Sequence, residues 1–193
     1  MGGGKYLPRA AGAGELAHNS LQPHRPTMTQ RPTLPWPPKP VALDRIDLKI
    51  LHLLQQDGRI SNLKLAEGVA LSPTAVQLRV QRLVREGVIQ GYSAQLNPLS
   101  LGLGLLVFVE VQLDKTTPNV FEAFKAAVQV QPAILECHMV AGGFDYLLKA
   151  RLRDMDAYRA FAGAVLWQLP GVRETRTYAV MEEVKSSNHL PLN

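Results

Sequence analysis

The sequence predicts an α+β protein of two domains, with three short helices followed by elements in the order β-α-β-β-α-β. Two observations support this prediction. Apolar residues recur at helical spacing between Leu43 and Gly87, with capping and stop residues between the segments. From Leu101 onwards, short runs rich in β-branched residues alternate with two helical patterns. A chain of 193 residues with 46 % hydrophobic residues is long enough for two small packed domains.

The first two predicted helices have capping residues in front of their apolar stripes. In LDRIDLKILHLLQQDGR, Asp44 is the expected N-cap and Gly58 the expected stop. In ISNLKLAEGVALS, either Ser61 or Asn62 is the expected cap of a shorter helix. Both segments place leucines and isoleucines at helical spacing, which indicates that they pack on one another.

The third helix is expected to begin at Ser72-Pro73 and to end at Gly87. Serine is favoured at the N-cap, and proline at the first helical position lacks only an N–H group that would be unbonded there. Glycine is favoured just after a helix because it adopts the left-handed conformation without strain. The following VIQGYSAQLNP predicts a strand that ends in turn residues.

One face of this third helix is apolar, since Val76, Val80 and Leu83 recur at i, i+4 and i+7. The remaining surface is rich in arginine and glutamine, which make paired hydrogen bonds to guanine and adenine. Three helices with a polar last helix form a helix-turn-helix arrangement, whose last helix enters the major groove. The alternative is an ordinary solvated face. The expected DNA-binding residues are Ser72, Thr74, Gln77, Arg79, Gln81, Arg82 and Arg85.

The second domain is predicted from its strands. LLVFVEVQL reads as a buried strand, NVFEAFKAAVQV as a helix, and ILECHMV and YLLKARL as strands joined by the turn AGGFD. Asp154 is expected to cap the helix MDAYRAFAGAVLWQL, and ETRTYAVMEEV is the last strand. This order is that of the ferredoxin-like fold, which hosts many functions.

The basic charge is concentrated in the first 40 residues. They hold eight of the fourteen prolines and carry a net charge of +4, whereas the remaining residues carry +1. We expect a disordered or extended tail, with Met28 as an alternative start to Met1 and a basic arm that touches DNA as an alternative role. The predicted organisation is a tail (1–40), a helix-turn-helix domain (41–92), a hinge (93–104), a ferredoxin-like domain (105–185) and a C-terminal tail (186–193).

Several classes are not expected. The single Cys137 excludes an intramolecular disulfide and fits a reducing cytosol, and neither a secretory signal nor a membrane-spanning run is visible. Glu136, Cys137 and His138 are consecutive on a predicted strand, so Cys137 faces away from the other two and a metal site is not expected. We find no nucleophile–base pair, phosphate loop or dinucleotide motif. The chain is therefore expected to be neither an enzyme nor a cofactor protein. With its expected DNA-binding helix and no export signal, it is expected to reside in the cytoplasm at the nucleoid.

Four segments together resemble the Lrp/AsnC family of transcriptional regulators, and its leucine-responsive type in particular. They are LDRIDLKILHLLQQDGRIS, LAEGVALSPTAVQLRVQRLVREGVIQGYSAQLNP, ECHMVAGGFDYLLKARLRDMDAYRAF and LPGVRETRTYAVMEEVK, within Leu43–Lys185. The resemblance implies a winged or plain helix-turn-helix joined to a ferredoxin-like effector domain. It also implies dimers formed through the sheet, assembly into tetramers or octamers, and an amino acid bound between dimers near the glycine-rich turn.

The turn AGGFDY has the chemistry that a free amino acid requires. Backbone N–H groups beside glycines approach a carboxylate closely, and an aspartate accepts hydrogen bonds from an ammonium group. Apolar neighbours would contact the side chain of the ligand. The alternative is a plain turn capped by its aspartate. The expected effector-binding residues are Met139, Gly142, Gly143, Phe144, Asp145 and Tyr146.

These expectations combine into a DNA-binding transcriptional regulator whose dimer binds a pseudo-palindromic operator in double-stranded DNA and responds to an amino acid. Leucine, other branched-chain amino acids and proline are candidate effectors. One alternative is a nucleoid-architectural protein that wraps DNA with little sequence preference. Another is a metabolite-binding module that acts on a partner protein.

Overall fold

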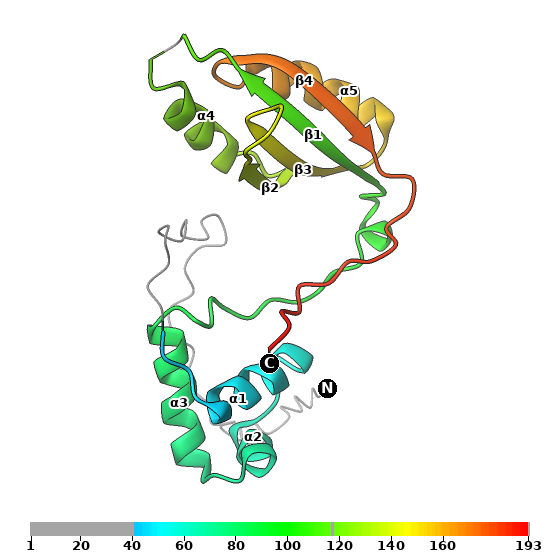
Figure 1. Cartoon of the computed structure of the whole chain (residues 1–193). Coiled ribbons are helices and arrows are strands. Elements are labelled where there is room, and N and C mark those ends of the chain that lie inside the picture. Colours follow the sequence, from blue (N-terminus) through cyan, green and yellow to red (C-terminus); the bar gives the residue numbers. More distant parts are fainter. Residues whose placement is uncertain (1–40, 117, 193) are drawn as a thin grey trace, which may run out of the picture. The chain divides into compact units, whose positions relative to one another are not determined.

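The computed structural model describes residues 41–116 and 118–192, which Figure 1 traces in colour along the chain. The predictions for the first 40 residues, including the alternative start at Met28, lie outside the described residues. None of the helices in the described part is long and apolar enough to cross a membrane. The helices of the first domain are α1 (Arg45–Gln56), α2 (Asn62–Val69) and α3 (Pro73–Arg85).

Side-chain caps fix where these three helices begin. Asp44 accepts a hydrogen bond from the backbone N–H of Asp47 at 2.8 Å, and Asp47 accepts one from the N–H of Asp44 at 3.1 Å. This reciprocal pair is a capping box with aspartate at both positions. Ser61 caps α2 and Ser72 caps α3 through their hydroxyl oxygens. The predicted caps are confirmed, with Ser61 rather than Asn62 at the start of α2.

A single apolar core holds α1, α2 and α3 together. Ile50 of α1, Leu65 of α2 and Val76 and Leu83 of α3 are at most 1 % exposed and form one cluster. The third helix ends as predicted, because Gly87 has a φ of 75° and takes the left-handed conformation just after it. Helical periodicity in the sequence therefore identified both the helices and their buried faces.

The strand predicted in residues 88–98 was wrong. These residues join no sheet within the described part of the chain, and residues 90–97 are exposed throughout. A strand requires a neighbour to pair with its N–H and C=O groups, and the described sheet is made of four other segments. Local composition favours extended backbone here, but it supplies no partner.

The second domain has the predicted order β-α-β-β-α-β, and its four strands form one antiparallel sheet in the order β2-β3-β1-β4. The central strands β1 and β3 are neighbours, and β4 lies on the other side of β1. The elements are β1 (Leu105–Leu113), α4 (Val120–Gln129), β2 (Ile134–Met139), β3 (Tyr146–Leu152), α5 (Met155–Ala164) and β4 (Val172–Ala179).

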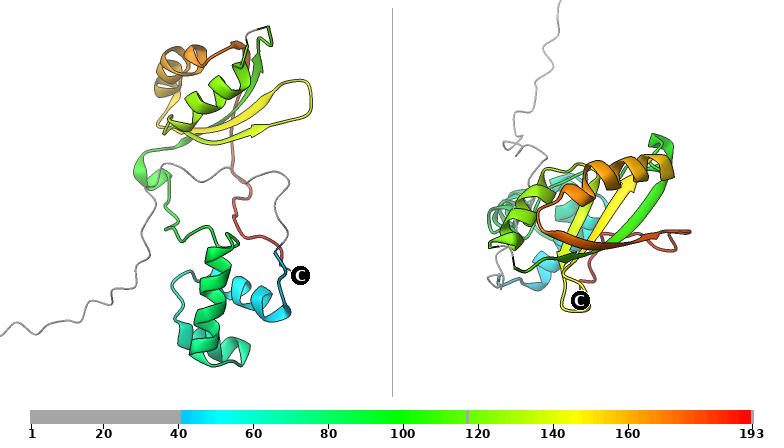
Figure 2. Two further views of the ribbon diagram at one scale, coloured as in Figure 1. Left: turned by 90° about the vertical axis from the view of Figure 1, so that its left-hand side faces the viewer. Right: turned by 90° about the horizontal axis from the view of Figure 1, so that it is seen from above.

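Both helices of this domain cover the same face of the sheet (Figure 2). Alternate residues of β1, such as Val107, Val109 and Val111, are fully buried beneath them together with Phe124 of α4. The opposite face has no helix over it among the described residues. It carries the alternate, more polar positions of the strands.

The two largest differences between predicted and observed element ends are at the ends of α5 and β4. The helix α5 stops at Ala164, and residues 166–168 form a tighter 3-10 turn instead of continuing it. The last strand was predicted to run through residues 174–184, but it ends at Ala179. The N–H of Val180 still donates to the carbonyl of Leu106 at 2.9 Å, and β1 begins only one residue earlier. Beyond that point β4 has no partner strand.

Gly171, just before β4, occupies a position that admits no side chain. Its φ is 70°, and a Cβ there would lie 2.0 Å from Cγ2 of Val120 at the start of α4. Its carbonyl also accepts the N–H of Asp114 at 2.8 Å. The first residue of α4 and the start of β4 thus approach one another too closely for any residue but glycine.

We therefore expect Gly171→Ala to lower the free energy of unfolding by about 2–5 kcal/mol, from left-handed strain plus overpacking. The matched control is Gly163→Ala within α5, where a Cβ meets open space and alanine favours the helix by about 0.5–1 kcal/mol. Urea unfolding of both variants at one protein concentration tests this. Equal stability of the two variants would contradict the close approach at Gly171.

Candidate DNA-binding helix and effector-binding turn

The surface of α3 is divided into three stripes by the helical repeat. Val76, Val80 and Leu83 face the core of the first domain. Arg79, Arg82 and Glu86 form a second stripe at i, i+3 and i+7. From 3.6 residues per turn, these two stripes lie roughly 90° apart around the helix axis.

The third stripe of α3 is exposed. Thr74, Leu78, Gln81 and Arg85 follow one another at i, i+4, i+7 and i+11, and all four are exposed. Leu78 lies within this polar stripe and is 62 % exposed. Two other predicted DNA-binding residues flank it: Ser72 is exposed at the helix start with its hydroxyl used as the cap, and Gln77 is half-buried.

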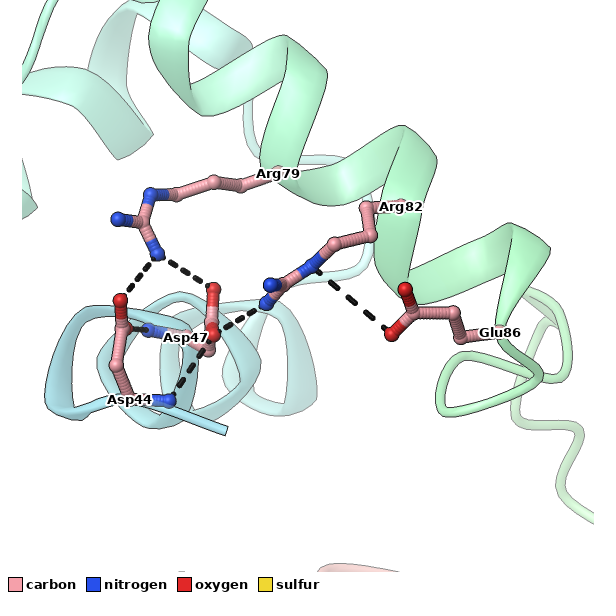
Figure 3. A network of polar contacts seen from close by, with 5 residues as sticks. All are labelled: Asp44, Asp47, Arg79, Arg82 and Glu86. Carbon is pink, nitrogen blue, oxygen red and sulfur yellow. Dashed lines mark hydrogen bonds and ion pairs between the residues drawn. The ribbon is translucent and has the colours of Figure 1, made fainter. Parts of the chain in front are cut away.

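Arg79 and Arg82 do not belong to the exposed stripe, and the structure pairs them with the capping box of α1 (Figure 3). Arg79 Nη1 donates to Asp44 Oδ2 at 2.6 Å and to Asp47 Oδ1 at 2.9 Å. Arg82 Nη2 donates to Asp47 Oδ2. Asp47 is completely buried, whereas Arg79 and Arg82 retain side-chain exposures of 28 % and 34 %.

This network stabilises its charged forms. The hydrogen bond from the N–H of Asp47, together with that from Arg79, holds the pKa of Asp44 below its usual value. Hydrogen bonds to Asp44 and Asp47 raise the pKa of Arg79. Asp44 was predicted as a cap, whereas neither Asp47 nor the pairing with the arginines was predicted from the sequence. The sequence pattern that indicates a capping box is the pair of aspartates three residues apart at the start of α1.

The second candidate site is the turn between β2 and β3. Gly142 and Gly143 are exposed, neither has the left-handed conformation, and a Cβ on either would meet open space. The fold of the single chain therefore gives no steric or conformational reason for glycine here. Glycine does leave the backbone open to a close approach by another molecule.

A hollow of about 150 Å³ lies beside this turn, on the helix-free face of the sheet. Its charged groups have both signs, and they interact only loosely with each other, because Arg176 is 3.9 Å from Glu110 and 4.0 Å from Glu174. These charged residues were not predicted from the sequence, since they come from two strands, β1 and β4, that become neighbours only in the sheet. The lining residues are Glu110, Gln112, Gly143, Phe144, Glu174 and Arg176.

Asp145 serves the fold of the turn. Its Oδ2 accepts the N–H of Leu113 at 2.9 Å, and its Oδ1 pairs with Lys115 Nζ at 2.9 Å. Burial disfavours the charged carboxylate, but the hydrogen bond from Leu113 and the pairing with Lys115 leave its pKa below the usual value. Both carboxylate oxygens thus have partners within the chain, which favours the alternative of an aspartate that anchors the turn.

Tyr146 and Met139, two further predicted effector-binding residues, do not line the hollow. Tyr146 is 1 % exposed, and its ring lies 4.6 Å from that of Phe124 between centroids, in the core beneath α4. Met139, at the end of β2, is 61 % exposed. The structure therefore brings Gly143 and Phe144 to the hollow, but not Tyr146.

The strand β2 separates its three reactive residues as predicted. Glu136 pairs with Lys149 at 2.8 Å and with His138 at 3.2 Å on the helix-free face. Cys137 packs against the core on the other face, and burial raises the pKa of its thiol to about 11. No group of three or more His, Cys, Asp or Glu residues within the described ranges is arranged to hold a metal ion.

We expect Asp145→Ala to lower the free energy of unfolding by about 1–3 kcal/mol at neutral pH, because the N–H of Leu113 loses its acceptor. The folded-state pKa lies below the ordinary value of 3.8, so this contribution is complete above that value. Its charge-dependent part is lost as the pH falls through the folded-state pKa, so the difference in stability between the two proteins narrows there. Unfolding curves from pH 7 to pH 2 test this. Unchanged stability at neutral pH would contradict the anchoring role.

The two domains match known families. Residues 43–90 match the winged helix-turn-helix DNA-binding family, and residues 106–190 match the Lrp/AsnC ligand binding domain. Leucine-responsive regulatory proteins from Salmonella typhimurium and Escherichia coli are each 60 % identical to this chain over 148 residues. Those residues make up 77 % of this chain and 90 % of the relative.

Solved structures agree with these matches. A transcriptional regulator from Neisseria meningitidis in complex with L-methionine aligns with a TM-score of 0.75 and 39 % identity, over 79 % of this chain and 98 % of that one. An AsnC family regulator from Agrobacterium tumefaciens aligns with a TM-score of 0.73 and 31 % identity, over 78 % and 97 %. The chain therefore belongs to the Lrp/AsnC family and is a DNA-binding transcriptional regulator with a ligand-binding domain.

Proposed function

We propose that this regulator binds a pseudo-palindromic operator through α3 and that a free amino acid bound beside the β2–β3 turn modulates it. The exposed stripe of α3 is the observation that carries the DNA part of the proposal. Thr74 and Gln81 supply groups for base edges, and Arg85 supplies a cation for a base or phosphate. Leu78, exposed among them, is suited to contact a thymine methyl group.

The start of α3 supports the same orientation. Thr74 of the exposed stripe lies in the first turn of α3, and the positive end of the helix dipole there attracts a phosphate, although Pro73 has no N–H and that of Ala75 donates to Ser72. Gln77 flanks the stripe as a further candidate for base contact. A helix placed in the major groove by its N-terminal half would bring Thr74 and Leu78 nearest to the bases.

The effector part of the proposal rests on the chemistry of the turn. An amino acid carries a carboxylate and an ammonium group, and the hollow offers Arg176 for the first and Glu110 or Glu174 for the second. Gly142 and Gly143 leave room for backbone N–H groups to approach, and Phe144 provides an apolar contact. Met139 pairs with Tyr146 on the helix-covered side of the sheet and is not part of this site. In this proposal Asp145 and Tyr146 hold the turn in place instead of binding the ligand.

The names of the relatives are consistent with an amino-acid effector. The two curated relatives are called leucine-responsive, and the solved Neisseria regulator contains L-methionine. We propose an effector of this apolar kind for the present chain, with leucine as the first candidate. The protein then acts by binding alone, in the cytoplasm and on the nucleoid.

Assembly completes the proposal. The helix-free face of the sheet carries half-buried Phe108 and Leu147 among polar groups, and it is the surface proposed to join two copies into a dimer. A two-fold dimer presents two copies of α3 to successive turns of one DNA face. Dimers would associate further into tetramers or octamers, and an effector bound in the hollow, on this same face of the sheet, would alter that association.

The first test is binding of the purified protein to DNA upstream of its own gene, with unrelated DNA as competitor. We expect retention that resists competitor at fixed salt and that shifts with one or a few of the twenty amino acids added singly. Sedimentation in parallel reports the assembly state. Retention that unrelated competitor DNA removes, and that no amino acid changes, would instead indicate an architectural protein with little sequence preference.

The effector site is tested with Arg176→Gln. Loss of one charge-assisted hydrogen bond to the ligand carboxylate corresponds to about 1.5–3 kcal/mol, or about 10- to 100-fold weaker amino-acid binding by calorimetry. The matched control is Arg173→Gln, an exposed arginine of the same strand that does not line the hollow. Equal affinities of both variants and the unchanged protein would place the effector elsewhere.

A further inference from the structure

We propose that Arg79 and Arg82 are positioning residues: together with the α1 capping box, they set the rotation of α3 so that its exposed stripe meets the bases. They do so by contacting Asp44 and Asp47 instead of DNA. This inference rests on the proposed DNA-facing surface of α3. It deepens that proposal by separating the arginine that meets DNA, Arg85, from the two that orient the helix.

The first step is the burial of Asp47. Its residue surface is 0 % exposed, and a buried carboxylate is stable in the folded state only if it is paired and hydrogen-bonded. It has three partners: the N–H of Asp44 at 3.1 Å, Arg79 Nη1 at 2.9 Å and Arg82 Nη2. Removal of either arginine would leave the buried charge with fewer partners, so the pairing is strongly favoured wherever this domain is folded.

The second step is geometric. Arg79 and Arg82 are three residues apart, so they attach α3 to α1 at two points nearly one turn apart (Figure 3). A single contact allows a helix to roll, whereas two contacts on one side, together with the buried stripe on another, resist rolling. A turn of one residue, roughly 100° about the axis, would replace Leu78 and Gln81 at the bases with their neighbours.

The charges of Arg79 and Arg82 are largely neutralised within the domain. The two guanidinium groups face two carboxylates, so this part of α3 contributes little net positive charge to a phosphate. Arg79 Nη1 is shared between Asp44 and Asp47, and the Nε of Arg82 is buried without a hydrogen-bond partner, 4.0 Å from Glu86. Arg85 lies on the exposed stripe and makes no ion pair with any residue in the described part of the chain.

The experiment compares full-length Arg82→Gln with Arg85→Gln, in operator DNA and in competitor DNA, over a salt series. For Arg82→Gln we expect the ratio of operator to competitor affinity to fall by about 5- to 100-fold, the size of a mismatched base pair, with an unchanged salt slope. For Arg85→Gln we expect both affinities to fall alike and the slope to decrease by about one. Thermal unfolding identifies a temperature at which every variant is folded.

A double-mutant cycle with Asp47→Asn supplies a readout that a simple loss of stability would not move. If Arg82 acts through Asp47, the double variant should discriminate operator from competitor no worse than the poorer single variant. If Arg82→Gln fails to fold, Arg79→Gln with Asp44→Asn repeats the cycle at the more exposed end of the network.

Four outcomes would contradict these proposals, and they are distinguishable. Equal weakening on both DNAs with a reduced salt slope for Arg82→Gln would make Arg82 a phosphate contact. Additive losses in the cycle, or an unchanged affinity ratio in Arg82→Gln, would also contradict the positioning role. Unchanged binding by both Arg85→Gln and Gln81→Ala would instead show that the proposed surface of α3 is wrong, whatever the behaviour of Arg82.

Discussion

The buried carboxylate of Asp47 is the constraint on which the first domain depends. It closes the capping box at the start of α1, and it also receives the guanidinium groups of α3. One side chain therefore determines both where a helix begins and how another helix lies against it. Replacement by an apolar residue would remove the reciprocal half of the capping box and the carboxylate that both arginines share. Arg79 would keep only Asp44 and Arg82 only the 4.0 Å contact with Glu86, so local and tertiary structure are coupled at this position.

The second domain uses a buried carboxylate in a comparable way. Asp145 links the turn before β3 to the end of β1, since it accepts the N–H of Leu113 and pairs with Lys115. The glycine-containing part of the turn is left exposed next to this anchor. In both domains a buried aspartate fixes the backbone or helix beneath a nearby exposed surface. In the proposed function, that exposed surface binds another molecule.

Sequence patterns predicted what depends on neighbours along the chain. The three helices of the first domain, the caps Asp44 and Ser72 and the strand β1 follow from helical spacing, capping chemistry and β-branched composition. Patterns failed where a partner distant in sequence decides the outcome. Residues 88–98 found no strand to pair with, the pairing of Arg82 with Asp47 spans 35 residues, and Arg176 meets Glu110 only because β4 lies beside β1. A helical wheel shows which residues share a face, but it does not show what that face touches.

The pairing of the two arginines has a consequence for how tightly a single copy holds DNA. Residues after position 41 carry a net charge of only +1, and two of the cations on α3 are already matched by carboxylates. In the assembly proposed above, these residues of a single copy then have weak electrostatic attraction to DNA, and stable occupancy comes from several copies bound at once. In such a multivalent system the effective concentration of the second copy exceeds its free concentration, so a small change in the number of linked copies changes residence on DNA steeply. Because a single copy binds weakly in this proposal, the number of assembled copies is the quantity that most strongly determines how long the protein stays on DNA.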